Sequence, residues 1–165
     1  MKRATRLVLV VALVTASASV VMARRGGGGG TGAALSAAEK AGLISLREEE
    51  KLARDVYLAL AEKWDLPIFS NIAASEQRHM DAVKNLLDKY GVADPVAGNG
   101  IGEFTNPAFA AMYTQLVAKG NTSQTDALEV GVAIEVMDID DIEALLEDVT
   151  HSDIERVYKN LLAGS

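Results

Sequence analysis

Residues 70–90 of this 165-residue chain read SNIAASEQRHMDAVKNLLDKY, and this stretch decides the fold prediction. Its packed positions recur at alternating three- and four-residue steps, which is the seam of a helix in an antiparallel bundle. Gly91 follows directly, and glycine commonly occupies the position just after a helix end. The stretch therefore predicts one long amphipathic helix. Its seam consists of Ile72, Glu76, His79, Val83, Leu86 and Tyr90.

Helix-start signals divide the rest of the chain into similar segments. Ser36 and Ser152 each precede a glutamate by three residues, which is the spacing of a capping box. Asn106-Pro107 and Ser123 are further N-terminal signals. We predict helices over 36–64, 70–90, 107–119 and 123–148 and from 153 onward. The predicted fold is all-α, a four-helix bundle with a short extra helix between its second and third helices and a last helix that is cut short.

Glutamates interrupt the seams of the two other long helices. The seam over 36–64 consists of Leu43, Leu46, Glu50, Ala53, Tyr57, Leu60 and Trp64, and the seam over 123–148 of Leu128, Val132, Glu135, Ile139, Ile142 and Leu146. A carboxylate in a bundle core must be protonated, paired with a base or bound to a metal ion. Because the seams carry no lysine or arginine, a divalent or trivalent cation would supply the missing positive charge.

The spacing of Glu76 and His79 indicates which kind of site this is. Residues three apart lie on one face of a helix, about one turn from each other. A Glu-x-x-His pair combined with single glutamates from partner helices is the ligand set of di-iron and di-manganese bundles. We therefore predict a dinuclear transition-metal centre, with iron as the metal and manganese as the alternative. Its predicted ligands are Glu50, Glu76, His79 and Glu135.

Two alternatives remain open at this point. The run Glu48-Glu49-Glu50-Lys51 could instead form a solvated face, and Glu49 could replace Glu50 as the ligand. Asp138 lies one turn after Glu135, where it would be either an additional ligand or a group that orients the histidine.

Composition excludes several classes of function. The chain has 23 acidic and 16 basic residues and a net charge of −7. Residues 1–35 contain five basic and no acidic residues, so the remaining chain carries −12. A body this acidic repels phosphate backbones, which argues against nucleic acid as a partner. The absence of cysteine excludes a disulfide scaffold, a thiolate-held metal cluster and a cysteine nucleophile.

The N-terminal residues have the layout of a secretory signal. Lys2, Arg3 and Arg6 precede an apolar stretch and then a series of small residues. An uncleaved anchor is the competing interpretation, but 7–23 falls short of the ~20 apolar residues that span a bilayer. We predict a signal peptide over 1–23, a glycine-rich linker over 24–35 and a helical domain over 36–165. The protein would then be secreted or periplasmic, with no stable membrane span after cleavage.

Residues 43–163 resemble the bacterial and archaeal DUF2202 family of the ferritin-like superfamily. The resemblance is carried chiefly by REEEKLARDVY at 47–57 and NIAASEQRHMDAV at 71–83. It implies a ferritin-like bundle and a dinuclear metal site at Glu50, Glu76, His79 and Glu135. Members of this family continue beyond the position of Ser165, so we expect the sequence either to be a fragment or to end early.

Together these features predict an exported metal protein of ferritin-like type. The expected chemistry is oxidation or detoxification with dioxygen or peroxide. The competing function is a non-enzymatic helical module that sequesters metal or binds another protein. A short last helix would expose an apolar groove, which suggests a homodimer.

Overall fold

The computed structural model describes residues 34–165, which form five helices and the segments that connect them. No strand occurs within this described range, so the all-α prediction is confirmed. The predicted signal peptide, and the linker up to residue 33, lie outside the described residues. The helices are α1 (Ala37–Trp64), α2 (Pro67–Tyr90), α3 (Pro107–Gly120), α4 (Gln124–Asp148) and α5 (Ser152–Leu162).

Side-chain caps begin three of the five helices as the sequence predicts. Ser36 and Glu39 form a complete capping box at the start of α1. The Asn106 side chain accepts a hydrogen bond from the backbone of Ala108 at the start of α3, and Ser123 accepts one from Asp126 at the start of α4. Each cap satisfies a backbone N–H that has no partner inside its helix.

The starts of α2 and α5 differ from the prediction. α2 begins at Pro67 rather than after Ser70, because a proline fits the first helical position and Ser70 already lies inside the helix, donating a hydrogen bond to the Pro67 carbonyl. The capping box predicted at Ser152 is wrong, since Ser152 is the first helical residue and His151 occupies the N-cap position.

Glu39 of α1 supplies the missing acceptor at the start of α5. Its Oε1 accepts hydrogen bonds from the backbone N–H groups of Thr150 (2.9 Å) and His151 (3.0 Å). Its Oε2 accepts from the backbone of Ser36 (2.9 Å). One buried carboxylate therefore joins the beginnings of two helices.

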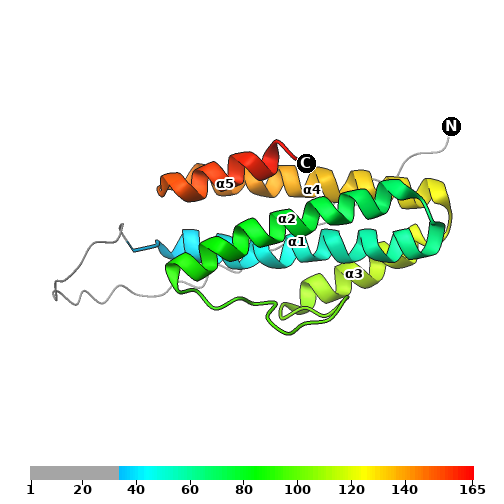
Figure 1. Ribbon diagram of the computed structural model, residues 1–165, viewed down its shortest axis with the longest axis horizontal. Helices are drawn as coiled ribbons and strands as arrows, with labels where there is room; N and C mark the ends of the chain where they lie inside the picture. The colour runs from blue at the N-terminus through cyan, green and yellow to red at the C-terminus, as the bar shows by residue number, and fades with distance from the viewer. Residues whose placement is uncertain (1–33) are drawn as a thin grey trace. The chain divides into compact units, whose positions relative to one another are not determined.

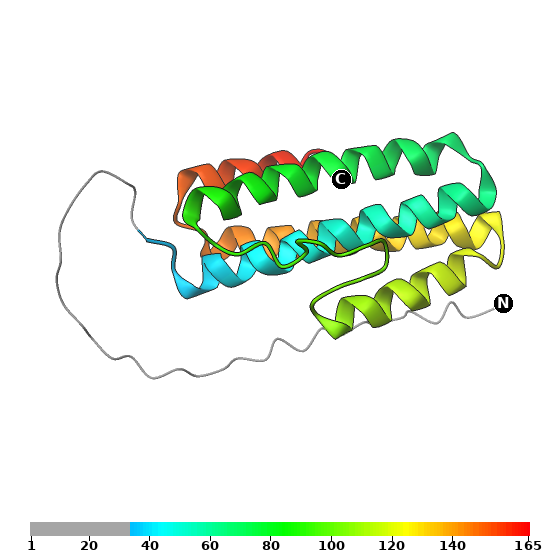
Figure 2. The ribbon, with the colours of Figure 1, turned by 60° about the horizontal axis from the view of Figure 1, so that its bottom comes forward.

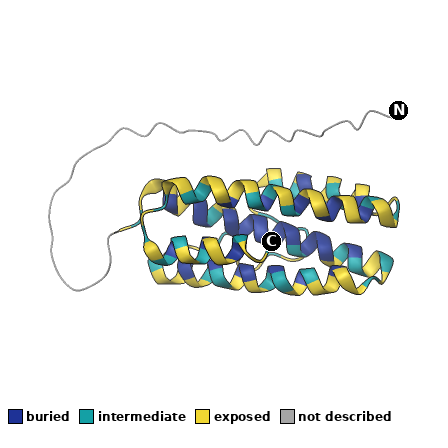
Figure 3. Ribbon diagram, turned by 90° about the horizontal axis from the view of Figure 1, so that it is seen from above, coloured by how far each residue is buried: buried dark blue, intermediate teal, exposed yellow. Residues whose placement is uncertain are grey.

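α1 is the central helix of the bundle. It packs against α2, α3 and α4, while α5 packs on α2 and α4 (Figures 1 and 2). The buried residues gather along the inner faces of the helices, as Figure 3 shows. Every residue of α1 from Leu46 to Ala53 is buried. The alternative that 48–51 form a solvated face is therefore excluded.

The packed face of α4 differs from the predicted seam. Leu128 and Val132 were assigned to the seam, but their side chains are 48% and 64% exposed. The buried residues of α4 are Ala127, Val130, Gly131, Ile134, Asp138 and Ile142. Apolar residues lie all around the first half of α4, so periodicity alone could not identify which face is packed.

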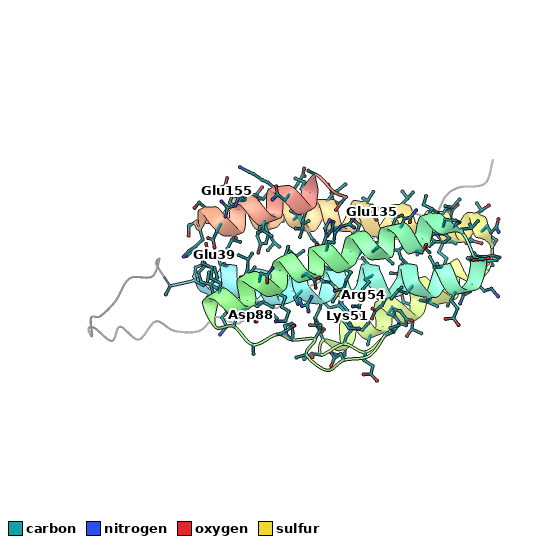
Figure 4. All side chains as sticks on the ribbon, viewed as in Figure 1. Glu39, Lys51, Arg54, Asp88, Glu135 and Glu155 are labelled. Carbon is teal, nitrogen blue, oxygen red and sulfur yellow. The ribbon has the colours of Figure 1, made fainter. Side chains whose placement is uncertain are left out.

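A polar layer attaches the loop between α2 and α3 to the outer side of α1. Glu48 accepts hydrogen bonds from the backbone N–H groups of Thr105 and Asn106. The Lys51 ammonium pairs with Asp55 and donates to the Gly100 carbonyl (2.6 Å). Lys51 and Arg54 lie on the side of α1 that faces this loop, away from Glu135 (Figure 4). The buried Lys51 is thus engaged by Asp55 and by this loop.

Within residues 34–165, no helix combines the length and the apolar character needed to cross a bilayer.

Candidate metal centre

Three of the predicted ligands converge in the interior of the bundle. Glu50 comes from the middle of α1, and Glu76 and His79 come from one face of α2. All three are buried, with exposed fractions of 1%, 4% and 8%. One ligand atom from each lies within 4.8 Å of the other two. These residues could therefore hold a metal ion.

His79 lies between the two carboxylates. Its Nδ1 is 3.1 Å from Glu76 Oε2 and 3.3 Å from Glu50 Oε2. The turn after α5 covers the other side of the ring, since a Cβ added at Gly164 would lie 2.9 Å from His79 Nε2. The one-turn spacing of Glu76 and His79 thus places both side chains where the sequence predicts.

Glu50 is left without a hydrogen-bond donor. Both of its carboxylate oxygens are buried and have no hydrogen-bond partner among the described residues. The nearest buried bases of α1 are engaged elsewhere, Arg47 with Asp94 and Lys51 with Asp55. A buried carboxylate without donors is costly, and a bound cation would offset that cost. The residues present therefore fit a metal ion.

The ionisation of the site follows from burial and from its crowded carboxylates. Burial raises the pKa of Glu50, an effect that His79 opposes. Burial disfavours the imidazolium form of His79, but the Glu50 and Glu76 carboxylates raise the pKa of His79 above its ordinary value. Without a metal, a proton on His79 is the positive charge that partly balances the two acids.

Glu135 lies beside the three converging residues rather than among them. It is only half-buried, and its Oε1 accepts a hydrogen bond of 2.5 Å from the Tyr57 hydroxyl. Burial raises the pKa of its carboxyl, and the nearby Glu76 and Asp138 add to that shift. Figure 4 shows Glu135 on α4, the helix across from α2. Its role as a ligand stays a prediction.

Asp138 and Glu49, the two open alternatives, are both buried beside the site. Asp138 is 5% exposed and accepts a hydrogen bond of 2.5 Å from the Ser165 hydroxyl. Glu49 is 4% exposed, and its Oε1 has no partner within the described residues. The sequence signal for Glu49 was the unbroken Glu48-Glu49-Glu50 run, since three consecutive residues point in three directions around a helix.

A groove leads from the surface to Glu76 and Glu135. A pocket of about 440 Å³ reaches Glu76 and Glu135 and is bordered by Arg78 and by Ser165 at the end of the chain. A second pocket of about 280 Å³ continues along α2 and α4, with Tyr57 and Glu135 among its lining residues. The remaining lining of this second pocket is apolar: Ile68, Phe69, Ile72, Leu128, Gly131, Val132 and Val136.

The region that contains these residues matches a known protein family. A family model described as "Uncharacterized protein domain (DUF2202)" matches residues 39–165. A relative described as "Uncharacterized protein MJ0754", from Methanocaldococcus jannaschii, is 56% identical over 131 residues, which cover 79% of this chain and 71% of the relative. The crystal structure of hypothetical protein MJ0754 from Methanococcus jannaschii aligns with a TM-score of 0.79 at 53% identity. That alignment covers 83% of this chain and 78% of the other.

Proposed function

The chain belongs to the DUF2202 family, and we propose that it is a ferritin-like metal protein that binds a dinuclear transition-metal centre. Iron is the proposed metal, and manganese is the alternative. The proposed ligands are Glu50, Glu76, His79 and Glu135. The chemistry would be oxidation or detoxification with dioxygen or peroxide.

The observation that carries this proposal is the buried Glu50 carboxylate. Neither oxygen of the Glu50 carboxylate has a hydrogen-bond partner in the described chain. One of these oxygens lies within 4.8 Å of a ligand atom of Glu76 and of a ligand atom of His79. Two carboxylates and an imidazole are a suitable donor set for divalent iron or manganese. His79 Nδ1 lies 3.3 Å from Glu50 Oε2, so a protonated His79 would pair with the acids, but one imidazolium balances only one of the two carboxylate charges.

The helices around this group support the ferritin-like part of the proposal. α1, α2 and α4 each span more than six helical turns by their residue ranges, and α5 packs on both α2 and α4. In di-iron bundles, Glu-x-x-His pairs and single glutamates project inward from facing helices. Glu50 on α1, Glu76 and His79 on α2, and Glu135 on α4 follow that arrangement.

The surrounding residues would orient the ligands and limit water. The Tyr57 hydroxyl, held against both Gly131 O (3.2 Å) and Glu135 Oε1, fixes the orientation of the Glu135 carboxylate. The apolar lining of the pocket along α2 and α4 would admit a small uncharged oxidant while excluding bulky polar molecules. A bound iron pair would supply the redox chemistry for consuming such an oxidant.

Metal content of the purified full-length chain tests this proposal. After anaerobic loading with ferrous iron and removal of excess, we expect close to two irons per chain by elemental analysis. Glu50→Gln and His79→Ala should each remove most of the iron, because each deletes a ligand in the buried group.

Glu143→Gln is the matched control, because Glu143 is an exposed glutamate of α4 and should leave iron content unchanged. Wild-type protein without bound iron would reject the metal centre. Equal iron content in the control and in both ligand variants would reject the assigned residues.

An alternative function is a module that sequesters metal or binds another protein without catalysis. The exposed Leu128, Val132 and Val136 beside the groove favour it. Oxygen consumption by the iron-loaded chain separates the two functions. Uptake of dioxygen or peroxide supports oxidation, whereas bound iron with no uptake supports the module.

Export from the cytoplasm is also part of the proposal. It rests on the basic, apolar and small-residue order of 1–23. Cell fractionation with N-terminal sequencing of the exported form would test it, and a chain that retains its first residues in the cytoplasm would contradict it.

A further inference from the structure

Another pocket, of about 400 Å³, is lined by residues of α1, of the first half of α2 and of the loop before α3. It shares no lining residue with the groove or with the apolar pocket beside the candidate metal centre. Its size falls within the range of about 300–1,000 Å³ that is usual for small-molecule sites. Its lining combines apolar side chains with three polar ones, which belong to Arg54, Ser70 and Gln77.

The apolar part of this lining includes side chains that are unusually exposed. Leu58 of α1 is 36% exposed, and Ile101 of the loop is 61% exposed. Ala73 and Ala74 of α2 add further apolar surface. The other large apolar side chains that are exposed in residues 34–165 line the pocket along α2 and α4. Exposed apolar side chains gathered around a hollow, unlike those scattered singly, are typical of a ligand-binding site.

Arg54 supplies a positive group with unused donors. A guanidinium has five N–H donors. Arg54 Nε and Nη2 donate to Asp55 Oδ1 (2.9 and 2.6 Å), and Arg54 Nη1 donates to Gln77 Oε1 (2.7 Å). Two N–H groups of Arg54, one on each terminal nitrogen, therefore have no acceptor among the described residues. Such a pair of donors matches the two oxygens of a carboxylate.

The charge around Arg54 is positive, although the chain as a whole is acidic. Asp55 pairs with both Lys51 and Arg54, so these three groups together carry one surplus positive charge. Lys51 and Asp55 are buried, whereas the Arg54 side chain is 18% exposed and borders the pocket. A ligand with one negative charge would balance the surplus, and Arg54 is the group that it can reach.

We propose that this pocket binds a small organic monocarboxylate, an anion with an apolar body, and that Arg54 pairs with its carboxylate. The apolar body would pack against Leu58, Ile101 and the two alanines and remove their surfaces from water. A single negative charge matches the surplus positive charge, whereas inorganic phosphate has no apolar surface to bury. None of these residues is a proposed metal ligand, so the inference does not rest on the proposed function.

Titration of the full-length chain with benzoate, followed by heteronuclear NMR, tests the proposal. Benzoate joins one carboxylate to an apolar ring. An apolar cavity of about 150 Å³ already holds benzene, so a pocket of about 400 Å³ has room for benzoate. We expect saturable shifts of the backbone signals of Ala74 and Ile101. Benzamide, which has nearly the same shape without the charge, should bind at least about tenfold more weakly.

Two variants test the residues of the pocket. Arg54→Gln should weaken benzoate binding about tenfold or more, because it removes the charge and the paired donors. Ile101→Ser should weaken binding about threefold or more, since it removes apolar contact area. Ile101 is exposed, so the result for Ile101→Ser does not depend on whether Arg54→Gln folds.

Two controls separate this pocket from the candidate metal centre, where a carboxylate could also bind. Arg78→Gln removes an exposed arginine of α2 that lines the groove at Glu76 instead, and it should leave benzoate binding unchanged. Glu76→Gln should also bind benzoate as the wild type does, even when its iron content falls. Failure of the iron centre and failure of this pocket are therefore distinguishable.

Several outcomes would overturn the inference. Absence of benzoate binding by the wild type, or equal binding of benzamide, would show that the pocket is not a carboxylate site. Unchanged binding in both Arg54→Gln and Ile101→Ser would reject the assigned residues. Loss of binding in Glu76→Gln would place benzoate at the metal centre. Displacement of benzoate by an equal concentration of inorganic phosphate would show a general anion site.

Discussion

The charge of His79 governs how the candidate centre exchanges a proton for a metal ion. Its Nδ1 lies between Glu50 and Glu76, and these carboxylates raise the pKa of the imidazole against the opposing effect of burial. The metal-free site therefore stays protonated at neutral pH. A metal ligand must be the neutral imidazole, so binding has to displace that proton.

The pKa of His79 lies above the ordinary histidine value of 6.5. Metal affinity should therefore still depend on pH at pH values where an ordinary histidine is already neutral. Between pH 6 and 8 we expect the affinity for Mn²⁺, which avoids iron oxidation, to rise at least tenfold per pH unit, because His79 and the Glu50 carboxyl, whose pKa burial raises to about 8, both release protons when the metal binds. The sign follows from the raised pKa of His79, because protons still compete with the metal at neutral pH. Calorimetric titration at several pH values measures this, and an affinity that is constant above pH 6.5 would contradict it.

Individual side chains also show where prediction from the sequence reached its limit. The positions of Glu76 and His79 could be predicted, because their spacing fixes a shared helix face whatever the tertiary structure. The partners of Glu49 and Glu135 could not, because they depend on how α1 and α4 are rotated against each other. Tyr57 could be predicted as a seam residue one or two turns from Glu50 and near the site, but the hydrogen bond from its hydroxyl to Glu135 could not.

The ends of the helices could be predicted where neighbouring residues determine them, and less well where residues far away in the sequence determine them. Gly91 in the left-handed conformation ends α2 as expected, and three N-caps form as predicted. The start of α5 depends instead on Glu39, a residue 112 positions before His151. No local pattern in the sequence contains that contact.

Replacing Glu39 tests this long-range cap. Glu39→Ala leaves the backbone N–H groups of Thr150 and His151 and that of Ser36 without their acceptor. We expect the free energy of unfolding to fall by about 2–4 kcal/mol, because several partly buried donors lose one charged partner. Urea denaturation followed by circular dichroism measures the change.

Glu62→Ala is the control for this experiment. Glu62 is an exposed residue of the same helix, and its loss should change the unfolding free energy by less than about 0.5 kcal/mol. Equal stability of the two variants would show that Glu39 does not hold α5 in place.

At the scale of the helical domain, the short length of α5 affects two properties: the access of small molecules to the candidate site and the association of the chain with a second copy. α5 runs along only part of the length of α2 and α4 (Figure 1). Two pockets are lined by residues of α2 and α4, and one of them is also bordered by Gly164 and Ser165, just after α5. Leu128, Val132 and Val136 form an exposed apolar ridge beside this opening, spaced four residues apart on α4. Such ridges pack into the grooves of other helices.

We therefore predict that a second copy of the chain packs on this ridge. Light scattering coupled to gel filtration should give twice the mass of one chain, and Val132→Glu should give the mass of a monomer, because the charge would have to be buried in the interface. Ile101→Glu, at an equally exposed apolar residue of the loop before α3, should leave the dimer intact. A wild-type monomer would contradict this prediction.

The central claim is that Glu50, Glu76 and His79 bind a metal ion inside the bundle. Anomalous diffraction from a crystal of the iron-loaded chain, recorded on both sides of the iron absorption edge, tests it most directly. The account predicts an iron peak within coordination distance of all three side chains, with a second iron toward Glu135. An anomalous map with no peak among these residues, or with iron bound only at the surface, would contradict it.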